Sequence, residues 1–199
     1  MKKIFTLILL MVFLLKAGTI NAQGGDNCAI ASGSPVVLPF TAVGKSTCTG
    51  VDNYNAPLAT MTVPTCIDPG FTQGKDWLYY FTATTTGPVL IQLTNITTTP
   101  ATSPRWPSIS VWSGCPGSGG TCVGGIAALT YSAMIMQFNA TALQSYYIMI
   151  DSYPVIINTV PPDTIDCINY NISIDYTPAP TVQPTSTNIG FEQGDFSGW

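Results

Sequence analysis

The stretch from Gly74 to Leu93, GKDWLYYFTATTTGPVLIQL, decides the fold of this chain. Aromatic and aliphatic side chains alternate with other residues over 76–82 and again over 88–94, the period of two that is typical of half-buried β-strands. The pair Gly87-Pro88 breaks the pattern and turns the chain. Six side chains are predicted to face one core, where burial of each contributes about 1.5–3 kcal/mol: Trp77, Tyr79, Phe81, Val89, Ile91 and Leu93.

Short apolar runs separated by turn residues continue along the chain. No window of a dozen residues beyond the first 22 keeps apolar residues at the 3.6-residue spacing of a helix. Strands of about five residues separated by turns predict an all-β fold, an antiparallel β-sandwich with about eight strands. The further strands are predicted at residues 35–40, 59–63, 108–112, 127–131, 134–138, 145–151 and 170–174.

The first 22 residues have the pattern of a secretory signal peptide. Lys2 and Lys3 precede an apolar run over residues 4–15, and Ala22 offers a small residue at the expected cleavage position. The apolar run is shorter than the roughly 20 residues that span a bilayer. We therefore expect an exported protein, secreted or at the cell surface, with no membrane insertion after cleavage.

The composition divides the rest of the chain into three parts. Residues 23–177 form the predicted sandwich domain. Residues 178–187, PAPTVQPTST, are rich in proline and threonine, which predicts an extended linker. Residues 188–199 combine three aromatic side chains with glycines, and we interpret them as the truncated start of a second β-domain.

The charge of the exported part is low and acidic. Three of the six basic residues lie in the signal peptide, which leaves three cations against ten carboxylates and a net charge of −7. Three scattered cations cannot neutralise a run of phosphates, so nucleic acid is a poor candidate partner, and so is an anionic membrane surface. An extracellular glycan or protein remains as the expected partner.

All six cysteines lie in the exported part, and an even number in an oxidising compartment predicts disulfides. The turn-forming run PGSGGT between Cys115 and Cys122 predicts that these two pair, which would contribute roughly 2–3 kcal/mol. Six cysteines allow fifteen sets of pairings, and the sequence alone leaves the other two bridges open; Cys28–Cys66 and Cys48–Cys167 are the pairs we suggest. Zinc binding by the cysteines is disfavoured, because the chain has no CxxC motif and no histidine.

The order of several motifs resembles the bacterial pre-peptidase C-terminal type of β-sandwich, and more closely a secreted variant common in Bacteroidetes. That variant opens with Asp-Asn-Cys, matched by residues 26–28, and carries a Ser-Gly-Cys…Cys hairpin, matched by residues 113–122. The resemblance covers about residues 26–176. The motifs that carry it, in chain order, are GKDWLYYF, PVLIQL, SISVWSGCPGSGGTC, LQSYYIMID and INYNISI.

The resemblance implies a non-catalytic domain that accompanies secreted peptidases, glycoside hydrolases and adhesins. The closing GFEQGDFSGW resembles the start of a jelly-roll-type module found in the same proteins. The sequence shows neither the catalytic domain nor the C-terminal sorting domain that complete members carry. We therefore interpret the chain as a fragment of a longer protein. The activity of that longer protein cannot be inferred from this domain.

The residues offer little for catalysis. A serine triad lacks its histidine and a GxSxG motif, and the cysteines are better used as bridges. Asp163 and Asp166 could form the carboxylate pair of a glycosidase, but only Tyr153 and Tyr170 could stack on a sugar nearby. We expect no catalytic residue in this domain and no enzyme activity of its own.

Calcium is the one cofactor for which the sequence offers ligands. Calcium takes six to eight oxygens from carboxylates, amides and backbone carbonyls, which loops supply well. Some sandwiches of the resembled type bind calcium near the start of the domain, although these side chains also serve as turn and cap residues. The candidate ligands are Asp26, Asn27, Asp52, Asn53 and Asp76.

Aromatic residues in polar loops are the candidates for ligand binding. Trp106 lies between prolines and beside Arg105, and Tyr54 and Tyr153 sit in polar loops. Trp112 falls on the side of its strand away from the predicted core. A planar ring on a rigid loop can stack on a sugar or anchor a peptide, and it can also simply cover one end of a sandwich.

These observations predict a non-catalytic accessory binding or spacer module of a secreted or cell-surface multi-domain protein, acting in adhesion or substrate targeting. The alternative is the N-terminal fragment of a secreted hydrolase, a peptidase or glycosidase, whose catalytic domain lies beyond Trp199. A third hypothesis is a structural repeat of an adhesin. The continuation of the reading frame beyond Trp199 would discriminate among the three.

Overall fold

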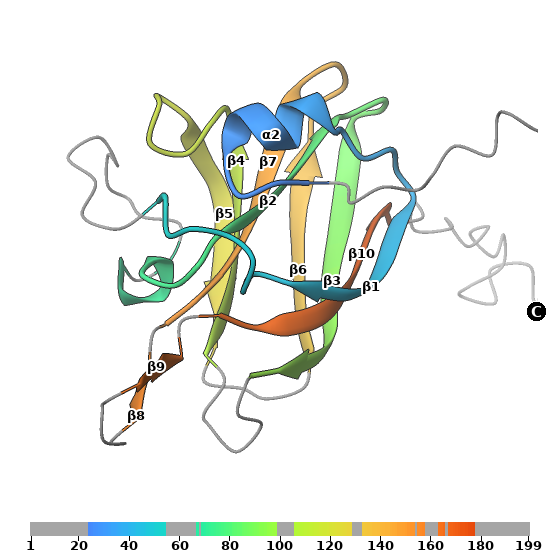
Figure 1. The fold of residues 1–199 in the computed structure, drawn as a ribbon. Helices are drawn as coiled ribbons and strands as arrows, with labels where there is room; N and C mark the ends of the chain where they lie inside the picture. Colours follow the sequence, from blue (N-terminus) through green and yellow to red (C-terminus); the bar gives the residue numbers. More distant parts are fainter. Residues whose placement is uncertain are drawn as a thin grey trace, which may run out of the picture.

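Figure 1 shows the computed structural model of the chain, in which two layers of antiparallel strands face each other. Residues 24–54, 67, 69–98, 106–128, 133–153, 155–157, 163–165 and 167–177 are described. The predicted all-β antiparallel sandwich of about eight strands is confirmed, because the two main sheets hold four strands each. The signal peptide, the linker and the start of a second domain, predicted at residues 1–22, 178–187 and 188–199, lie outside these residues.

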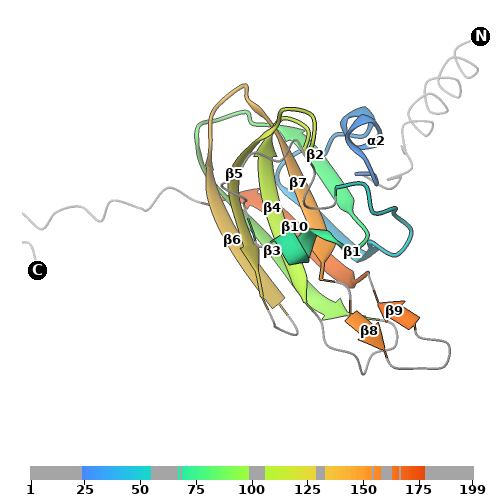
Figure 2. The same cartoon turned by 90° about the vertical axis from the view of Figure 1, so that its left-hand side faces the viewer.

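The two main sheets have different strand orders. The first runs β1-β10-β3-β6 and the second β2-β7-β4-β5, and a small hairpin, β8-β9, lies at one end (Figure 2). The first sheet consists of β1 (Phe40–Ser46), β10 (Asn169–Tyr176), β3 (Gly87–Thr97) and β6 (Ala133–Ala140). The second consists of β2 (Trp77–Thr82), β7 (Ser145–Ser152), β4 (Pro107–Ser113) and β5 (Thr121–Ala127), and the hairpin of β8 (Val155–Ile157) and β9 (Asp163–Ile165).

The two strands of the opening stretch lie in opposite sheets. β2 pairs with β7, whereas β3 pairs with β10 on one side and β6 on the other. Their alternating side chains therefore meet across the space between the sheets. Five of the six predicted core side chains are buried, and the sixth, Trp77, is half-buried against the same core.

Aromatic rings fill the middle of the core. Phe81 from β2 stacks on Tyr146 of β7, with ring centroids 5.6 Å apart, and both rings contact Phe138 from β6 in the opposite sheet. Aromatic pairs at such distances add to the energy of area burial. These three rings, from β2, β7 and β6, therefore hold the two sheets together.

Tyr79 and Tyr170 place two hydroxyl groups inside this core. The two residues lie on β2 and β10, each is at most 1% exposed, and their hydroxyl oxygens are 3.1 Å apart. Burial raises the pKa of both phenols above the ordinary value, so both stay neutral and each can donate or accept. One hydrogen bond thus crosses the sandwich between the two sheets.

We predict that Tyr79→Phe lowers the free energy of unfolding by about 1–3 kcal/mol, because it leaves the Tyr170 hydroxyl buried without its partner. Tyr170→Phe is expected to have a similar effect, and the double variant Tyr79→Phe/Tyr170→Phe is expected to lose less than the sum of the two. Urea unfolding of the four proteins gives the coupling energy directly. Additive losses would contradict a direct hydrogen bond.

Two helical segments cover parts of the second sheet. α2 (Cys28–Gly33) begins where the Asn27 side chain accepts the N–H of Ile30, and it packs on the outer face of that sheet together with Leu78 and Met149. The 3₁₀ turn η1 (Pro69–Thr72) contacts β7 and β4. In the part of the chain that the structure describes, no helix is long and apolar enough to cross a membrane.

The central strands were predicted correctly, but the first or last residue of several strands was predicted wrongly. The first strand begins at Phe40, after the two prolines, since Pro35 and Pro39 have no N–H for a ladder. The strand expected at 127–131 is replaced by β5, which starts six residues earlier, at Thr121, and ends at Ala127. The structure also has two short strands between β7 and β10, namely β8 and β9, which we did not predict from the sequence. The strand expected at 59–63 lies outside the described residues.

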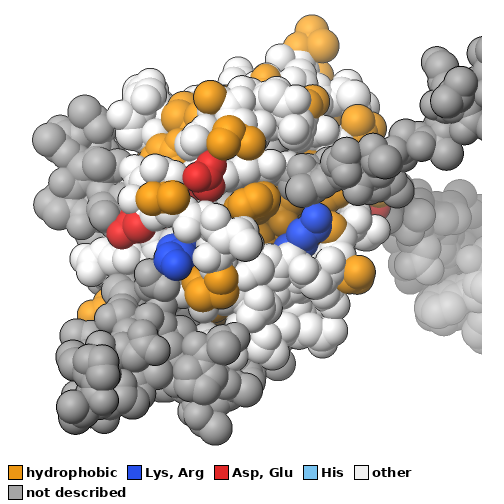
Figure 3. All heavy atoms as spheres, viewed as in Figure 1, with side chains coloured by type: hydrophobic (Ala, Val, Ile, Leu, Met, Phe, Trp, Pro, Cys, Tyr) orange, Lys and Arg blue, Asp and Glu red, His pale blue; other side chains and the backbone are white. Residues whose placement is uncertain are grey.

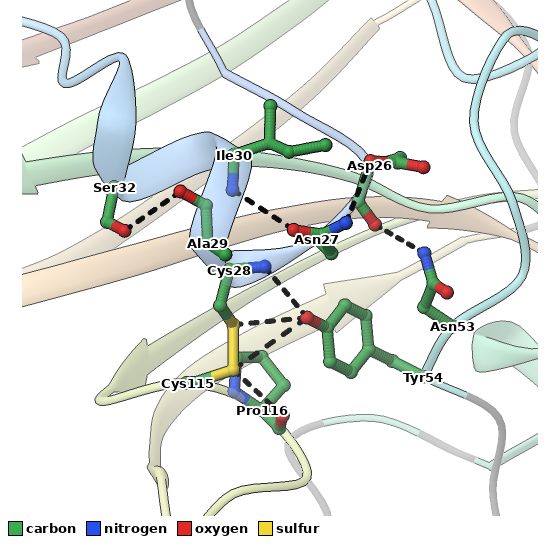
Figure 4. Close-up of a disulfide and its surroundings, with 10 residues drawn as sticks. All are labelled: Asp26, Asn27, Cys28, Ala29, Ile30, Ser32, Asn53, Tyr54, Cys115 and Pro116. Atoms are coloured by element: carbon green, nitrogen blue, oxygen red, sulfur yellow. Dashed lines mark hydrogen bonds between the residues drawn. A yellow bond between two sulfur atoms is a disulfide. The ribbon is translucent and has the colours of Figure 1, made fainter.

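The predicted bridge between Cys115 and Cys122 is wrong. Cys115 is joined to Cys28 of α2 (Figure 4). Cys122 is disulfide-bonded, but not to Cys115. The chain reverses direction just after Cys115, where the Cys115 carbonyl accepts the N–H groups of Ser118 and Gly120. The following strand sets Cys122 opposite Trp112, so Cys115 and Cys122 are not cross-strand partners, and Cys115 instead meets Cys28 of α2.

Of the other two predicted disulfides, one is wrong and one is confirmed. Cys28–Cys66 is wrong, because Cys28 is bonded to Cys115. Cys48–Cys167 is confirmed and joins the end of β1 to the start of β10. No described cysteine is free. Disulfides of this kind persist in oxidising environments, which supports an extracellular location of the folded domain.

Candidate functional site

Three aromatic rings from distant parts of the sequence meet at one end of the second sheet. Phe71 lies in η1, Trp106 directly before β4 and Tyr153 directly after β7. The Tyr153 ring lies 4.9 Å from the Trp106 ring and 5.7 Å from the Phe71 ring, between centroids. We call these three residues the aromatic cluster.

The backbone fixes the aromatic cluster on the sheet. Pro107 and Ser152 are partners in the ladder between β4 and β7, and the Tyr153 N–H donates to the Trp106 carbonyl at 2.8 Å, which continues the pairing one residue further. The hydroxyl of Ser108 donates to the Phe71 carbonyl at 2.9 Å and holds η1 against the sheet. The rings are thus placed by regular structure rather than by a free loop.

The rings are not parallel to one another. Trp106 is inclined by 56° to Tyr153, and Phe71 by 68°. Tyr153 is 36% exposed, while the other two rings are half-buried. The aromatic cluster is therefore an inclined group of ring faces and edges that can contact a small apolar or sugar surface, and it is not a flat platform.

The other sequence-based ligand candidates lie elsewhere. Tyr54 is 8% exposed and its hydroxyl accepts the N–H of Cys28 at 2.9 Å (Figure 4). Trp112 is 4% exposed and its indole N–H donates to Ser110 at 2.9 Å. Our expectation that these two rings are exposed is wrong, because other segments cover the outer face of the second sheet. Arg105 lies outside the described residues.

The candidate calcium ligands come together near the start of the domain, where their polar groups serve intramolecular hydrogen bonds. The Asn27 amide caps α2 and donates to the Asp26 carboxylate, and the Asn53 amide donates to the Asp26 carbonyl (Figure 4). One oxygen of Asp76 accepts the N–H groups of Asn53 and Tyr54. These bonds tie loop 51–54 to the chain before α2 and to the start of β2.

Asp52 is the fifth candidate, and its charge acts on Asp76. Within the described ranges, no group of three or more His, Cys, Asp and Glu side chains is arranged to hold a metal ion. Calcium binding remains a prediction from the sequence.

Two residues of this region were missed in the sequence analysis. Phe71 lies in the run DPGF, where an aromatic residue follows a turn-forming pair, and such a residue could have been added to the loop candidates. Asp151 ends the apolar run YYIMI and is completely buried. A carboxylate that continues an apolar strand is a signal of a buried polar contact, which we interpreted only as a strand end.

One face of the molecule carries few charges. Figure 3 shows hydrophobic and uncharged polar side chains over most of the face in view, with few Lys, Arg, Asp or Glu. This agrees with the 8% of charged residues in the sequence. Recognition through such a surface depends on hydrogen bonds and ring contacts more than on ion pairs.

Neither a scan against models of protein families nor a comparison with curated proteins finds a match for this chain. A comparison with solved structures finds a family 35 carbohydrate binding module from an environmental isolate. The match has a TM-score of 0.28 and 13% sequence identity, and it covers 54% of this chain and 73% of that chain.

Proposed function

We propose that this domain is a non-catalytic accessory module of a secreted or cell-surface multi-domain protein, and that it binds an extracellular glycan through the aromatic cluster. The observation that supports the proposal most directly is the convergence of Phe71, Trp106 and Tyr153 from three segments at one end of the sandwich. Rings held by a rigid sheet can contact a ligand with little loss of side-chain freedom on binding.

A glycan suits the site better than a protein does. A stable protein interface buries about 800 Å² on each partner and is centred on a group of aromatic or Arg anchors. Outside the aromatic cluster, the large exposed hydrophobic residues of the described chain are single residues on different elements. They are Ile30, Val37, Val43, Val51, Val123, Ile135 and Leu143.

The inclination of the rings limits the form of the glycan. Stacking on the flat surface of a crystalline polysaccharide needs rings in one plane, whereas these are inclined by 56° and 68°. A single sugar unit or a twisted, soluble chain can contact two inclined rings at once. We therefore expect binding to soluble oligosaccharides and weak binding to insoluble crystalline ones.

We predict that Tyr153→Ala weakens glycan binding by about tenfold or more, because the central ring of an aromatic site contributes on the order of 1–3 kcal/mol. Trp106→Ala is expected to act in the same direction, and Tyr153→Phe to keep most of the affinity because it keeps the ring. Binding is measured by titration calorimetry with soluble oligosaccharides selected on a glycan array. Circular dichroism and the unfolding midpoint establish that each variant is folded.

Leu143→Ala serves as the matched surface control, since Leu143 is 87% exposed at the turn between β6 and β7. It is expected to bind as the wild type does. If the wild-type domain binds no soluble glycan, or if Tyr153→Ala binds as tightly as the control, the proposal is wrong. Glycan hydrolysis by the purified domain would contradict its non-catalytic part.

The proposed module fits both hypotheses for the parent protein. In an adhesin it would attach the protein to a surface polysaccharide. In a secreted hydrolase it would hold the catalytic domain near its substrate and raise the local substrate concentration. The identity of any domain that accompanies this one in the full-length protein would distinguish the two.

A further inference from the structure

Three of the four edge strands of the two main sheets are bent or covered. A free edge presents unpaired N–H and C=O groups to other chains, so folded proteins bend, charge or cover their edges. The pairing of β1 with β10 is interrupted between Ala42 and Lys45, and Lys45 carries a charge. β2 is covered, because Gly25 exchanges two backbone hydrogen bonds with Leu78. The pairing of β5 with β4 is interrupted by an extra residue, Val123.

β6 is the fourth edge strand, and it has none of these features (Figure 2). Its sequence, AMIMQFNA, contains no charged residue, no proline and no glycine. Its register with β3 is continuous from Ala133 to Ala140. β5 passes close to β6 where Gly124 approaches the Met136 side chain, but the described residues of these two strands form no ladder. β6 therefore offers a regular, uncharged edge of eight residues.

The backbone groups on this edge belong to every second residue of β6. The Thr177 N–H donates to the Pro88 carbonyl at 3.0 Å, so Pro88 directs its carbonyl toward β10. Successive residues of an antiparallel strand direct their backbone groups to opposite sides, so Val89 directs its groups toward β6, where its partner is Phe138. Phe138 and every second residue from it therefore bond to β3. The residues between them, whose N–H and C=O groups point to the free edge, are Ala133, Ile135, Gln137 and Asn139.

This edge is available to a partner. Within the part of the chain that the structure describes, no other segment forms a backbone hydrogen bond with the outer side of β6. The side chains of the same four residues are exposed on the outer face of the first sheet, and Ile135 is 57% exposed. A strand that paired here would meet free backbone groups and a surface without charges.

We propose that two copies of this chain associate through β6, antiparallel about a two-fold axis, so that their first sheets form one continuous sheet. β6 is suited to pairing with itself because it has no charge that its own copy would repel. With the axis at Met136, Ile135 lies opposite Gln137 of the second copy, and Ala133 lies opposite Asn139. All residues with free groups then face one another, and each pair can exchange two hydrogen bonds.

Pairing of this kind predicts a weak dimer. A single pair of strands is smaller than the interface of about 800 Å² per partner that is typical of stable complexes. Ile135 is the only large apolar side chain that β6 exposes. The association therefore depends on backbone hydrogen bonds rather than on an apolar patch, and we expect it to increase with concentration.

Sedimentation velocity of the wild-type protein between about 10 μM and 1 mM measures the association. We expect the average mass to rise toward twice that of the monomer. Amide hydrogen exchange locates the contact, because the amides of Ile135, Gln137 and Asn139 should exchange more slowly as the concentration rises. The Met136 amide is an internal reference, since it is bonded to β3 in the monomer and should change little.

Gln137→Pro is the most direct variant, because the Gln137 N–H points to the free edge and is not part of the ladder with β3. By symmetry the substitution removes this donor from both copies. We predict that the dissociation constant of the dimer rises by about tenfold or more. Gln137→Ala keeps the N–H group and is the matched control, which is expected to keep most of the association. Circular dichroism establishes that both variants are folded.

Charged variants test the register, and they do not depend on whether Gln137→Pro folds. Ile135→Lys/Gln137→Lys places like charges opposite each other across the axis, and so does Ile135→Glu/Gln137→Glu. Each double variant is expected to be monomeric alone. An equimolar mixture of the two is expected to form a mixed dimer, because every Lys then lies opposite a Glu.

Three outcomes would overturn the proposal. A wild-type protein that stays monomeric at the highest of these concentrations would leave the edge to a strand of a different protein or to none. A dimer whose β6 amides exchange at unchanged rates would associate through another surface. Charged variants that stay monomeric when mixed would exclude this register. None of these measurements uses a glycan, so their result is independent of the proposed binding function.

Discussion

Replacing Cys48 and Cys167 together by alanine is expected to lower the free energy of unfolding by about 4 kcal/mol. This disulfide joins residues separated by 119 positions, so it removes much of the freedom of the unfolded chain. It also joins the segment just before β10 to the segment just after β1, a strand that pairs with no other strand than β10 among the described residues. Without the bridge, β1 keeps its hydrogen bonds but loses its covalent link at that end.

Urea unfolding of the oxidised variant and wild type measures this loss. A reducing agent supplies the control, because reduction removes the bridge from the wild type and should bring the two unfolding curves much closer together. Equal unfolding midpoints under oxidising conditions would show that the bridge contributes little to stability.

The same variant also tests which cysteine pairs with Cys115. In the described chain, trypsin can cleave after Lys45 and Lys75, and it can also cleave after Arg105. Without the bridge between residues 48 and 167, a Cys28–Cys115 disulfide still links the peptide that ends at Lys45 to the peptide that begins at Trp106. Bridges Cys115–Cys122 and Cys28–Cys66 would instead leave the later peptide separate, which mass spectrometry of the unreduced digest would detect.

Phe81→Ala is expected to destabilise the domain by about 3–5 kcal/mol, the usual range for removing a buried aromatic ring from a core. Phe81 is 1% exposed and contacts Tyr146 and Phe138, so its loss leaves a cavity between rings that belong to both sheets. The loss is measured as the change in unfolding free energy in urea at constant pH.

Two further variants distinguish the cost of a cavity in the core from the cost of removing an apolar side chain at any position. Phe81→Leu fills much of the space and is expected to lose clearly less than Phe81→Ala. Ile135→Ala removes an apolar side chain that is 57% exposed on the outer face of β6, and we expect a change within about 0.5 kcal/mol. If Ile135→Ala and Phe81→Ala cost the same, the assigned faces of these strands are wrong.

The sandwich could be predicted from the sequence because the alternation of apolar and polar residues along a strand indicates which side chains are buried. Along β6 every second residue is buried, and β3 keeps the same pattern over most of its length. The pattern does not report which strands become neighbours. β2 and β3 are consecutive, yet they belong to opposite sheets, because pairing depends on contacts between residues far apart in the sequence.

The site was harder to predict for the same reason. Trp106 and Tyr153 were identified as loop aromatics, but nothing local shows that they touch or that Phe71 joins them. Burial also reverses local expectations, as for Tyr54, a tyrosine in a polar loop that is covered and hydrogen-bonded to α2. Proximity along the chain was misleading for Cys115, because the strand register, rather than the length of the turn, decides which sulfur atoms meet.

The bridge between Cys48 and Cys167 makes a covalent ring of most of the sandwich. A single backbone cut anywhere inside that ring, for example by a protease acting after Lys75, produces two pieces that stay connected. Such a nicked molecule can keep its fold, because the strands on either side of the cut remain in place. Tolerance of this kind suits a protein that is exposed to proteases.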